Sequence, residues 1–167
     1  MDRQFDPARG SLVGMQGPVG IRLHSPVIAE CGQALINFYS QESVLDKRFQ
    51  DVAILITARS HDSEVEWAAH DPAARRAGVP DATITAILEQ APTDGLDADD
   101  ALIIDVGRQL FGKRHIDQDL YDRAATRFGN RGLVELVSLM AQYAGTAHLL
   151  AAFDMQLPAG KQPVMGS

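Results

Sequence analysis

The stretch that decides the fold reads RFQDVAILITARSHDSEVEWAAH, from Arg48 to His70. In its first half apolar residues recur at helical spacing and their neighbours are apolar as well, which predicts a helix buried on most sides. The second half begins at Ser63 and predicts another helix that ends near Gly78, because glycine commonly follows the last helical residue. Pro72 lies inside this second helix, where the missing amide donor predicts a kink just past His70.

The rest of the chain repeats this helical pattern. Residue types that favour a helix start precede each apolar repeat, and the expected starts are Ser25, Asp46, Ser63, Asp81, Asp97 and Asp117. The longest and most apolar helix is expected from about Arg131 to Phe153, after a break at Gly129. No stretch alternates apolar and polar residues as a strand does. We therefore expect an all-α, single-domain bundle of about seven helices, with an irregular arm over residues 1–20, a helical domain over 21–158 and a tail over 159–167.

The composition is that of a folded, acidic protein. The chain has 167 residues, of which 46% are hydrophobic, and its net charge is −7. That length is enough for one ordinary core. An acidic surface repels nucleic acid and anionic lipid, so neither is expected as a partner, whereas a small anionic substrate held by a local arginine is compatible with it. The most apolar stretch, residues 133–153, is interrupted by polar residues and predicts a buried helix rather than a membrane span.

The chain has a single cysteine, Cys31. One cysteine excludes an internal disulfide, a Cys-x-x-Cys redox site and a thiolate zinc cage. An unpaired cysteine fits a reducing compartment, and the first residues lack the apolar segment of a secretory signal, so a cytoplasmic location is expected. Cys31 falls on the same helical stripe as Val27, Ile28 and Leu35, which predicts that it is a core residue.

Candidate groups for chemistry gather in the second helix of the opening stretch. Glu66 and His70 are four residues apart and therefore lie on one face of the helix, with Ser63 nearly on the same face. A carboxylate beside an imidazole is a workable acid–base pair, because the carboxylate fixes the tautomer of the ring and raises its basicity. A structural alternative stays open. Ser63-x-x-Glu66 is also a capping box, in which the serine binds the amide of Glu66 and the glutamate reaches back.

A metal site is a further alternative, because a glutamate and a histidine at this spacing can share an ion. No third ligand is evident: His61 and Asp62 lie at the helix start, about two turns from His70, and no metal is expected. Among the other histidines, His24 precedes a helix start and is the reserve candidate for the site. There is no glycine-rich phosphate loop and no G-x-S-x-G elbow, so nucleotide binding and α/β-hydrolase chemistry have no support.

Several features occur together in a particular order along the chain. They are the run Arg48–Leu55, the pattern Glu66-Trp67-x-x-His70 with Gly78 eight residues later, Gly78-Val79-Pro80, the run Arg131–Val137 and Tyr143-Ala144-Gly145. With this ordered set the sequence resembles the carboxymuconolactone decarboxylase and alkylhydroperoxidase D-like superfamily, over roughly residues 18–158. The resemblance implies the alkylhydroperoxidase D-like fold and a homotrimer or hexamer with a pocket near a subunit boundary. An oligomer is also expected because the last helix is apolar around most of its circumference.

The peroxidase branch of that superfamily has the pattern acid-x11-Cys-x2-Cys-x3-His. In this sequence the acid falls on Asp51, the two cysteines fall on Ser63 and Glu66, and the histidine falls on His70. Both thiols are missing, and a peroxidase of this type needs one thiolate to attack the peroxide and a second to resolve it. The resemblance therefore implies the fold without the peroxidase chemistry. A peroxide-reducing protein and a non-catalytic binding protein of the same fold are the alternatives.

The decarboxylase branch uses neither a thiol nor a cofactor, and Glu66 and His70 match it. The resemblance implies lyase or isomerase-type acid–base chemistry on a small carboxylated cyclic or aromatic-derived compound, as in the catabolism of aromatic compounds. We expect His70 to donate or accept the proton, Glu66 to orient or share it, and Asp51 to support the pair. Candidates for binding the substrate are Ser63, His24, Trp67 as a pocket wall, and Arg59 and Arg75 as holders of a carboxylate.

Overall fold

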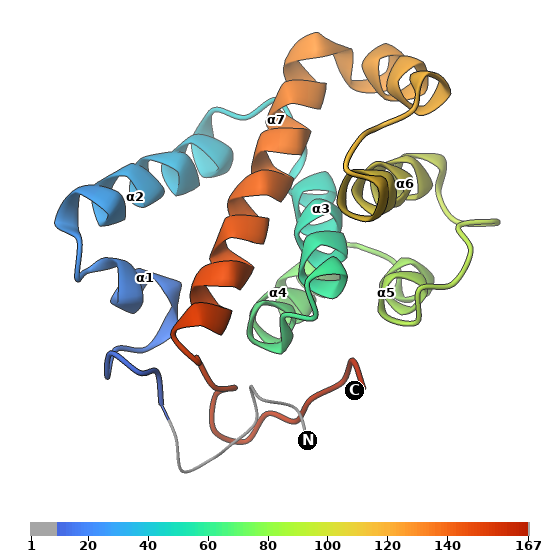
Figure 1. Cartoon of the computed structure of the whole chain (residues 1–167). Helices are drawn as coiled ribbons and strands as arrows, with labels where there is room; N and C mark the ends of the chain where they lie inside the picture. Colours follow the sequence, from blue (N-terminus) through green and yellow to red (C-terminus); the bar gives the residue numbers. More distant parts are fainter. Residues whose placement is uncertain (1–9, 167) are drawn as a thin grey trace.

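A computed structural model describes residues 10–166 of the chain (Figure 1). These residues form seven helices and no strand: α1 Gly17–Arg22, α2 Pro26–Gln41, α3 Lys47–Ser60, α4 Glu64–Arg76, α5 Asp81–Leu88, α6 Ala98–Lys113 and α7 Gln118–Ala152. The expected all-α bundle is confirmed. No helix in this part of the chain combines the length and the apolar character that crossing a membrane requires.

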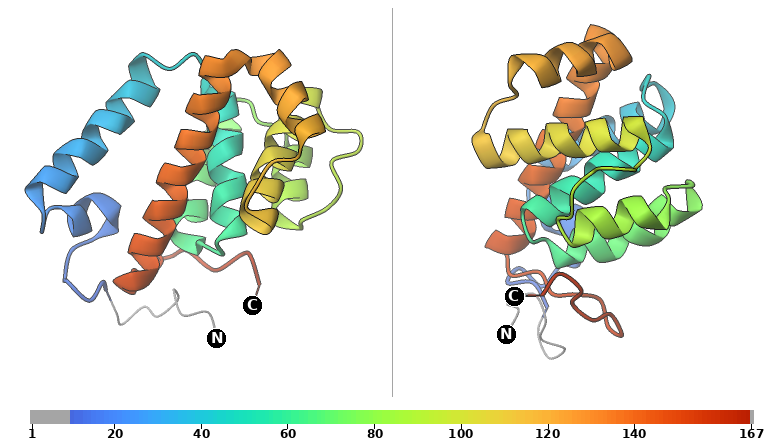
Figure 2. Two further views of the ribbon diagram at one scale, coloured as in Figure 1. Left: turned by 45° about the horizontal axis from the view of Figure 1, so that its top comes forward. Right: turned by 90° about the vertical axis from the view of Figure 1, so that its right-hand side faces the viewer.

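Helix α3 is the centre of the bundle. It packs against α4, α5, α6 and α7, and every residue from Gln50 to Ala58 is buried. The prediction that this helix is buried on most sides is therefore confirmed. Figures 1 and 2 show α5 and α6 on one side of α7, and α1 and α2 on the other. Because α4 follows α3 after a short turn, its buried face lies against the same core.

Two expected boundaries differ from the structure. The irregular arm was expected to extend to residue 20, but α1 begins at Gly17; residues 1–9 lie outside the described part of the chain. The two last helices are joined into α7, which is interrupted at Gly129, where φ is 69° and ψ is 167°. The predicted break at this glycine is thus present, since a positive φ is a conformation that glycine adopts at little cost.

Helix α2 stands apart from the bundle and packs mainly against α1. Of its sixteen residues only Tyr39 is buried. Its apolar stripe, formed by Val27, Ile28, Leu35 and Ile36, is exposed, with Val27 68% and Ile28 56% accessible. Cys31 lies on this stripe and is exposed, so the prediction that it is a core residue is wrong. The stripe is apolar as expected, but it faces away from the core.

The segment after α7 folds back onto the start of α4. The carboxylate of Glu64, which is 2% exposed, accepts hydrogen bonds from the backbone amides of Val164 (3.0 Å) and Met165 (2.7 Å). Met165 also packs against the main core. The end of the described chain is therefore attached to the first turn of α4 by charge-assisted hydrogen bonds.

Candidate functional site

A cavity of about 210 Å³ lies between α1, α2, α4 and α7. Its polar lining consists of Arg22, Glu66, His70, Gln142, Tyr143 and Thr146, and apolar side chains such as Ile36, Val65 and Leu150 complete it. We call it the Glu66 cavity. Small, largely apolar cavities with a few convergent polar groups are typical of sites for small molecules.

Glu66 is buried in the first turn of α4 and is only 3% exposed. Neither of its carboxyl oxygens has a hydrogen-bond partner among residues 10–166. Burial raises the pKa of Glu66 to about 8, against the smaller opposing effects of the Ser63 hydroxyl and of Arg22. Most Glu66 side chains are therefore protonated at neutral pH, and the group is an acid that can give up a proton.

His70 lies one turn further along α4, with its ring edge-on to Tyr143 at a centroid distance of 5.0 Å. Burial lowers the pKa of His70 to about 4; Asp51 acts in the opposite direction, and Lys47 adds to the lowering. The imidazole is therefore neutral at pH 7 and can accept a proton.

The two groups lie on one face of α4, as their spacing predicted, and both line the cavity, but the expected contact between the carboxyl group and the imidazole is absent. The charged groups that act on His70 are Asp51 and Lys47, and Glu66 has no hydrogen bond to the ring. The capping-box alternative is wrong as well. Ser63 precedes α4 without a side-chain cap, and its hydroxyl has no partner in the described part of the chain.

Asp51 lies beneath the site on α3 and is fully buried. One of its oxygens accepts a hydrogen bond from Nζ of Lys47 at 2.5 Å, and the other has no partner within residues 10–166. Its negative charge favours the protonated form of His70. Asp51 is thus placed to stabilise an imidazolium when His70 takes up a proton.

Of the lining residues that were not among the expected site residues, Arg22 and Tyr143 bear most on the chemistry. Arg22 at the end of α1 donates from Nη2 to Oγ1 of Thr146 on α7 at 2.7 Å. Burial raises the pKa of Tyr143 to about 12, with further contributions from Glu66 and Asp51, so its hydroxyl stays neutral. Tyr143 belongs to one of the segments that carry the family resemblance. No sequence signal pointed to Arg22, because it follows a stretch that was expected to be irregular.

The other candidates lie elsewhere. Trp67 is 4% exposed and belongs to the main core rather than to the lining of the Glu66 cavity. His24 is exposed in the turn before α2. Arg75 pairs with Asp71 and Asp81 on the surface, and Arg59 lines a different cavity. The structure therefore brings together Glu66 and His70, with Asp51 and Ser63 close behind, and leaves the two expected carboxylate-binding arginines outside.

The arrangement in the Glu66 cavity combines one uncharged acid, one uncharged base and one guanidinium. Within residues 10–166 no group of three or more histidine, cysteine, aspartate or glutamate side chains is placed to hold a metal ion. The chemistry that these side chains themselves can perform is the transfer of protons to and from a bound molecule.

No protein-family model matches the chain, and a comparison with characterised proteins finds none that is significantly similar.

Proposed function

We propose that the protein is an enzyme that catalyses proton transfer at carbon, in a lyase or isomerase reaction, on a small carboxylated cyclic compound. The observation that carries this proposal is the presence of Glu66 and His70, both uncharged at neutral pH, in one largely apolar cavity. An acid and a base with pKa values pushed apart by burial are a recurrent feature of sites for general acid–base catalysis. The resemblance of the α3–α4 segment to the carboxymuconolactone decarboxylases supports the same class of reaction.

In an isomerisation, His70 takes a proton from the carbon next to a carbonyl group while Glu66 gives its proton to the carbonyl oxygen. When the substrate is an unsaturated ketone, the product of this step is a dienol, and it collapses when His70 returns the proton to the far end of the diene and Glu66 takes its proton back. In a decarboxylation, the bond to the carboxylate breaks, carbon dioxide leaves, and the electron pair moves into the conjugated acceptor. Glu66 then protonates the new carbanion, and water restores the proton on Glu66.

Arg22 is the group that gives the site its preference for a carboxylate. Its Nη2 is held by Thr146, which fixes the guanidinium at the wall of the Glu66 cavity. Arginine binds carboxylates in a fork of two parallel hydrogen bonds. The volume of about 210 Å³ suits a molecule with a single ring. In a decarboxylation, Arg22 would hold a carboxylate other than the one that leaves, because it stabilises the charged form.

A direct test uses carboxymuconolactone in D₂O, with NMR following both the loss of carbon dioxide and the incorporation of deuterium at carbon. We expect turnover by the wild-type protein and a loss of at least about a hundredfold in His70→Ala, as removal of a positioned acid–base group produces. His24→Ala, at an exposed histidine, is the matched control and should be unchanged. If neither this compound nor a panel of small carboxylated lactones and cyclic enones reacts or exchanges, the proposal is wrong.

The same experiment separates the alternatives. Saturable binding without exchange would favour a non-catalytic binding protein. Consumption of thiols with added peroxide would favour a peroxide-reducing protein. The chain has only one cysteine, however, so it lacks the second thiol with which the family's peroxidases resolve the oxidised one.

We also propose that the protein assembles through α2 into a trimer or larger oligomer. The exposed apolar stripe of α2 would be covered by another copy, and Ile36 of that helix lines the Glu66 cavity. Assembly would then also close the cavity from the outside. Light scattering at micromolar concentration should give the mass of a trimer or more, and Ile28→Asp should lower that mass without unfolding the monomer. A monomer in both proteins would contradict the proposal.

A further inference from the structure

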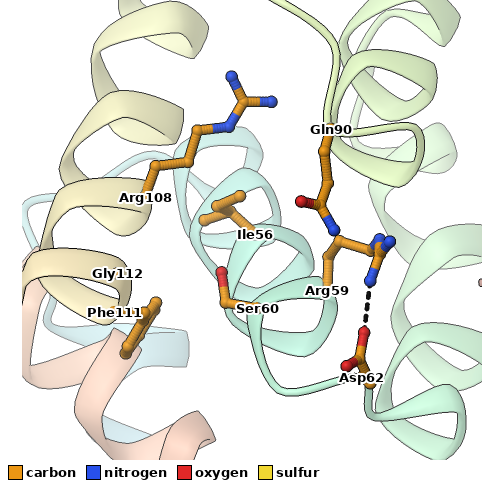
Figure 3. A pocket seen from close by; sticks show the side chains of 8 residues that line it. All are labelled: Ile56, Arg59, Ser60, Asp62, Gln90, Arg108, Phe111 and Gly112. Atoms are coloured by element: carbon orange, nitrogen blue, oxygen red, sulfur yellow. Dashed lines mark hydrogen bonds and ion pairs between the residues drawn. The ribbon is translucent and has the colours of Figure 1, made fainter.

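A second cavity lies between α3, α6 and the turn after α5, and its volume of about 430 Å³ exceeds that of the Glu66 cavity (Figure 3). Its lining includes the side chains of Ile56, Ser60, Gln90, Arg108 and Phe111, together with the pair Arg59–Asp62. We call it the arginine cavity. It shares no lining residue with the Glu66 cavity, so an inference about it is independent of the proposed function.

Each nitrogen of the Arg59 guanidinium has a partner. Its Nε donates to the carbonyl of Leu88 at 2.8 Å, and Nη1 pairs with the exposed carboxylate of Asp62. When the side-chain amide of Gln90 is turned so that its oxygen faces Arg59, that oxygen accepts a hydrogen bond from Nη2 of Arg59 at 2.7 Å. The amide NH₂ group of Gln90 is then left as a donor.

Arg108 stands on the opposite side of the arginine cavity (Figure 3). Its Nη2 donates to the carbonyls of Ala86 (3.1 Å) and Ala91 (2.7 Å) at the end of α5. These two bonds give Arg108 a structural role, because they connect α6 to the carbonyl of Ala86 on α5 and to that of Ala91 in the loop that follows. They also fix the guanidinium, while Nε and Nη1 have no partner in the part of the chain that the structure describes. Arg108 thus keeps two positioned donors that the fold does not use.

The remaining lining is apolar or uncharged. Ile56 and Ser60 lie between the two arginines, and the flat ring of Phe111 forms a wall on the side of Arg108 (Figure 3). Two arginines and one aspartate give the lining a net charge of +1, whereas the whole chain carries −7. A positive site on an acidic protein is selective for an anion, and the apolar wall is suited to a flat, uncharged body.

We propose that the arginine cavity is a binding site for a small organic anion. The anionic group of the ligand accepts a hydrogen bond from an unused N–H group of the Arg108 guanidinium, with the hydroxyl of Ser60 and the amide of Gln90 as further donors. Its flat apolar part lies against Ile56 and Phe111. A guanidinium is always charged, and its hydrogen bonds to a carboxylate or phosphate are charge-assisted.

Benzoate is the probe, because it joins a carboxylate to a single flat ring. With isotope labels on the isoleucine methyl groups, Ile56 reports on the arginine cavity and Ile36 reports on the Glu66 cavity. We expect a saturable shift of Ile56. Benzamide, which lacks the charge, and inorganic phosphate, which lacks the ring, should each bind at least about tenfold more weakly. The proposal would be overturned if either benzamide or inorganic phosphate bound as tightly as benzoate.

The blocking variant is Gly112→Leu. Gly112 lines the arginine cavity, and a Cβ atom added there meets no other atom within 4 Å. The Cβ of the new side chain therefore has room, and the substitution keeps the bonds from Arg108 to α5, which Arg108→Gln would remove. We expect at least about a tenfold loss of benzoate affinity with an unchanged or higher melting temperature. Gly145→Leu on α7, which also has open space around its Cβ, is the matched control and should bind normally.

Arg22→Gln separates this site from the proposed active site. It removes a guanidinium from the Glu66 cavity and should leave the Ile56 titration unchanged. Three results would overturn the proposal: no saturable shift of Ile56 up to about 10 mM benzoate, an unchanged affinity in Gly112→Leu, or shifts confined to Ile36. None of these results depends on whether the protein turns over carboxymuconolactone.

Discussion

Glu66→Gln is expected to stabilise the protein, by an amount that grows with pH. The pKa of Glu66 is about 8 in the folded protein and 4.5 in its ordinary state. Between these values the unfolded chain loses the proton and the folded chain keeps it, so the wild-type protein loses stability as the pH rises from 4.5 to 8. At 1.36 kcal/mol per pKa unit, the loss amounts to about 4–5 kcal/mol above pH 8. Glutamine resembles the protonated acid and does not titrate.

The measurement is urea unfolding of wild type and Glu66→Gln at pH 4.5, 6.5 and 8.5. We expect the two proteins to be similar at pH 4.5 and to differ by about 3–5 kcal/mol at pH 8.5. Glu64→Gln, two residues earlier on the same helix, is the matched control. Glu64 accepts three backbone hydrogen bonds, so its replacement should destabilise the protein by about 1–3 kcal/mol. A difference between Glu66→Gln and wild type that is independent of pH would show that Glu66 is charged in the folded protein.

The substitution His70→Gln is expected to make the free energy of unfolding less sensitive to acid than that of the wild-type protein. The pKa of His70 is about 4 in the folded protein and 6.5 in its ordinary state. As the pH falls from 6.5 to 4, the histidine is protonated in the unfolded chain but stays neutral in the folded chain. The free energy of unfolding of the wild-type protein therefore falls by about 3 kcal/mol. Glutamine does not titrate, so this contribution to the pH dependence should be absent in the variant.

The measurement is the free energy of unfolding of each protein at pH 4.5 and at pH 7, and the value at one pH is subtracted from the value at the other. A change in packing that the substitution causes equally at both pH values cancels in this subtraction. His24→Gln, at an exposed position before α2, should keep the wild-type pH dependence. If His70→Gln also keeps it, the ring of His70 is accessible to protons in the folded protein, and the role of His70 as a neutral base would have to be abandoned.

The helical bundle was predictable because its strongest signals are local. The run from Val52 to Ile56 is apolar at every position, which a helix tolerates only when other elements enclose it, and α3 has that position. Asp97 and Asp117 precede α6 and α7 and accept amide hydrogen bonds there, as N-cap residues do. Each of these predictions depends on residues within one or two turns of each other.

The surroundings of an apolar stripe were not predictable in the same way. Helical spacing placed Cys31 and Ile28 on one face of α2, but spacing does not say what that face contacts. In the structure the core is filled mainly by α3, α6 and α7, and α2 contributes to it only near its C-terminal end, with Phe38 and Tyr39. The expectation for Cys31 failed for this reason.

The site was predictable only in part. The i, i+4 spacing placed Glu66 and His70 on one face of a helix, and both line one cavity. Their protonation states depend on burial by α1, α2 and α7, which are remote in sequence. Arg22, for example, is 124 residues from its partner Thr146. The spacing suggested a carboxylate that raises the basicity of the imidazole, whereas burial favours two neutral groups.

The attachment of Val164 and Met165 to Glu64 has a consequence for biosynthesis. Glu64 and the amide of Val164 are separated by 100 residues, so a ribosome that adds about 5–20 residues per second makes the partner roughly 5–20 s after the glutamate. During that interval a buried Glu64 carboxylate would lack its acceptor bonds to these amides, which disfavours early burial of the first turn of α4. The helix that carries Glu66 and His70 therefore reaches its final environment only after Val164 and Met165 have been synthesised.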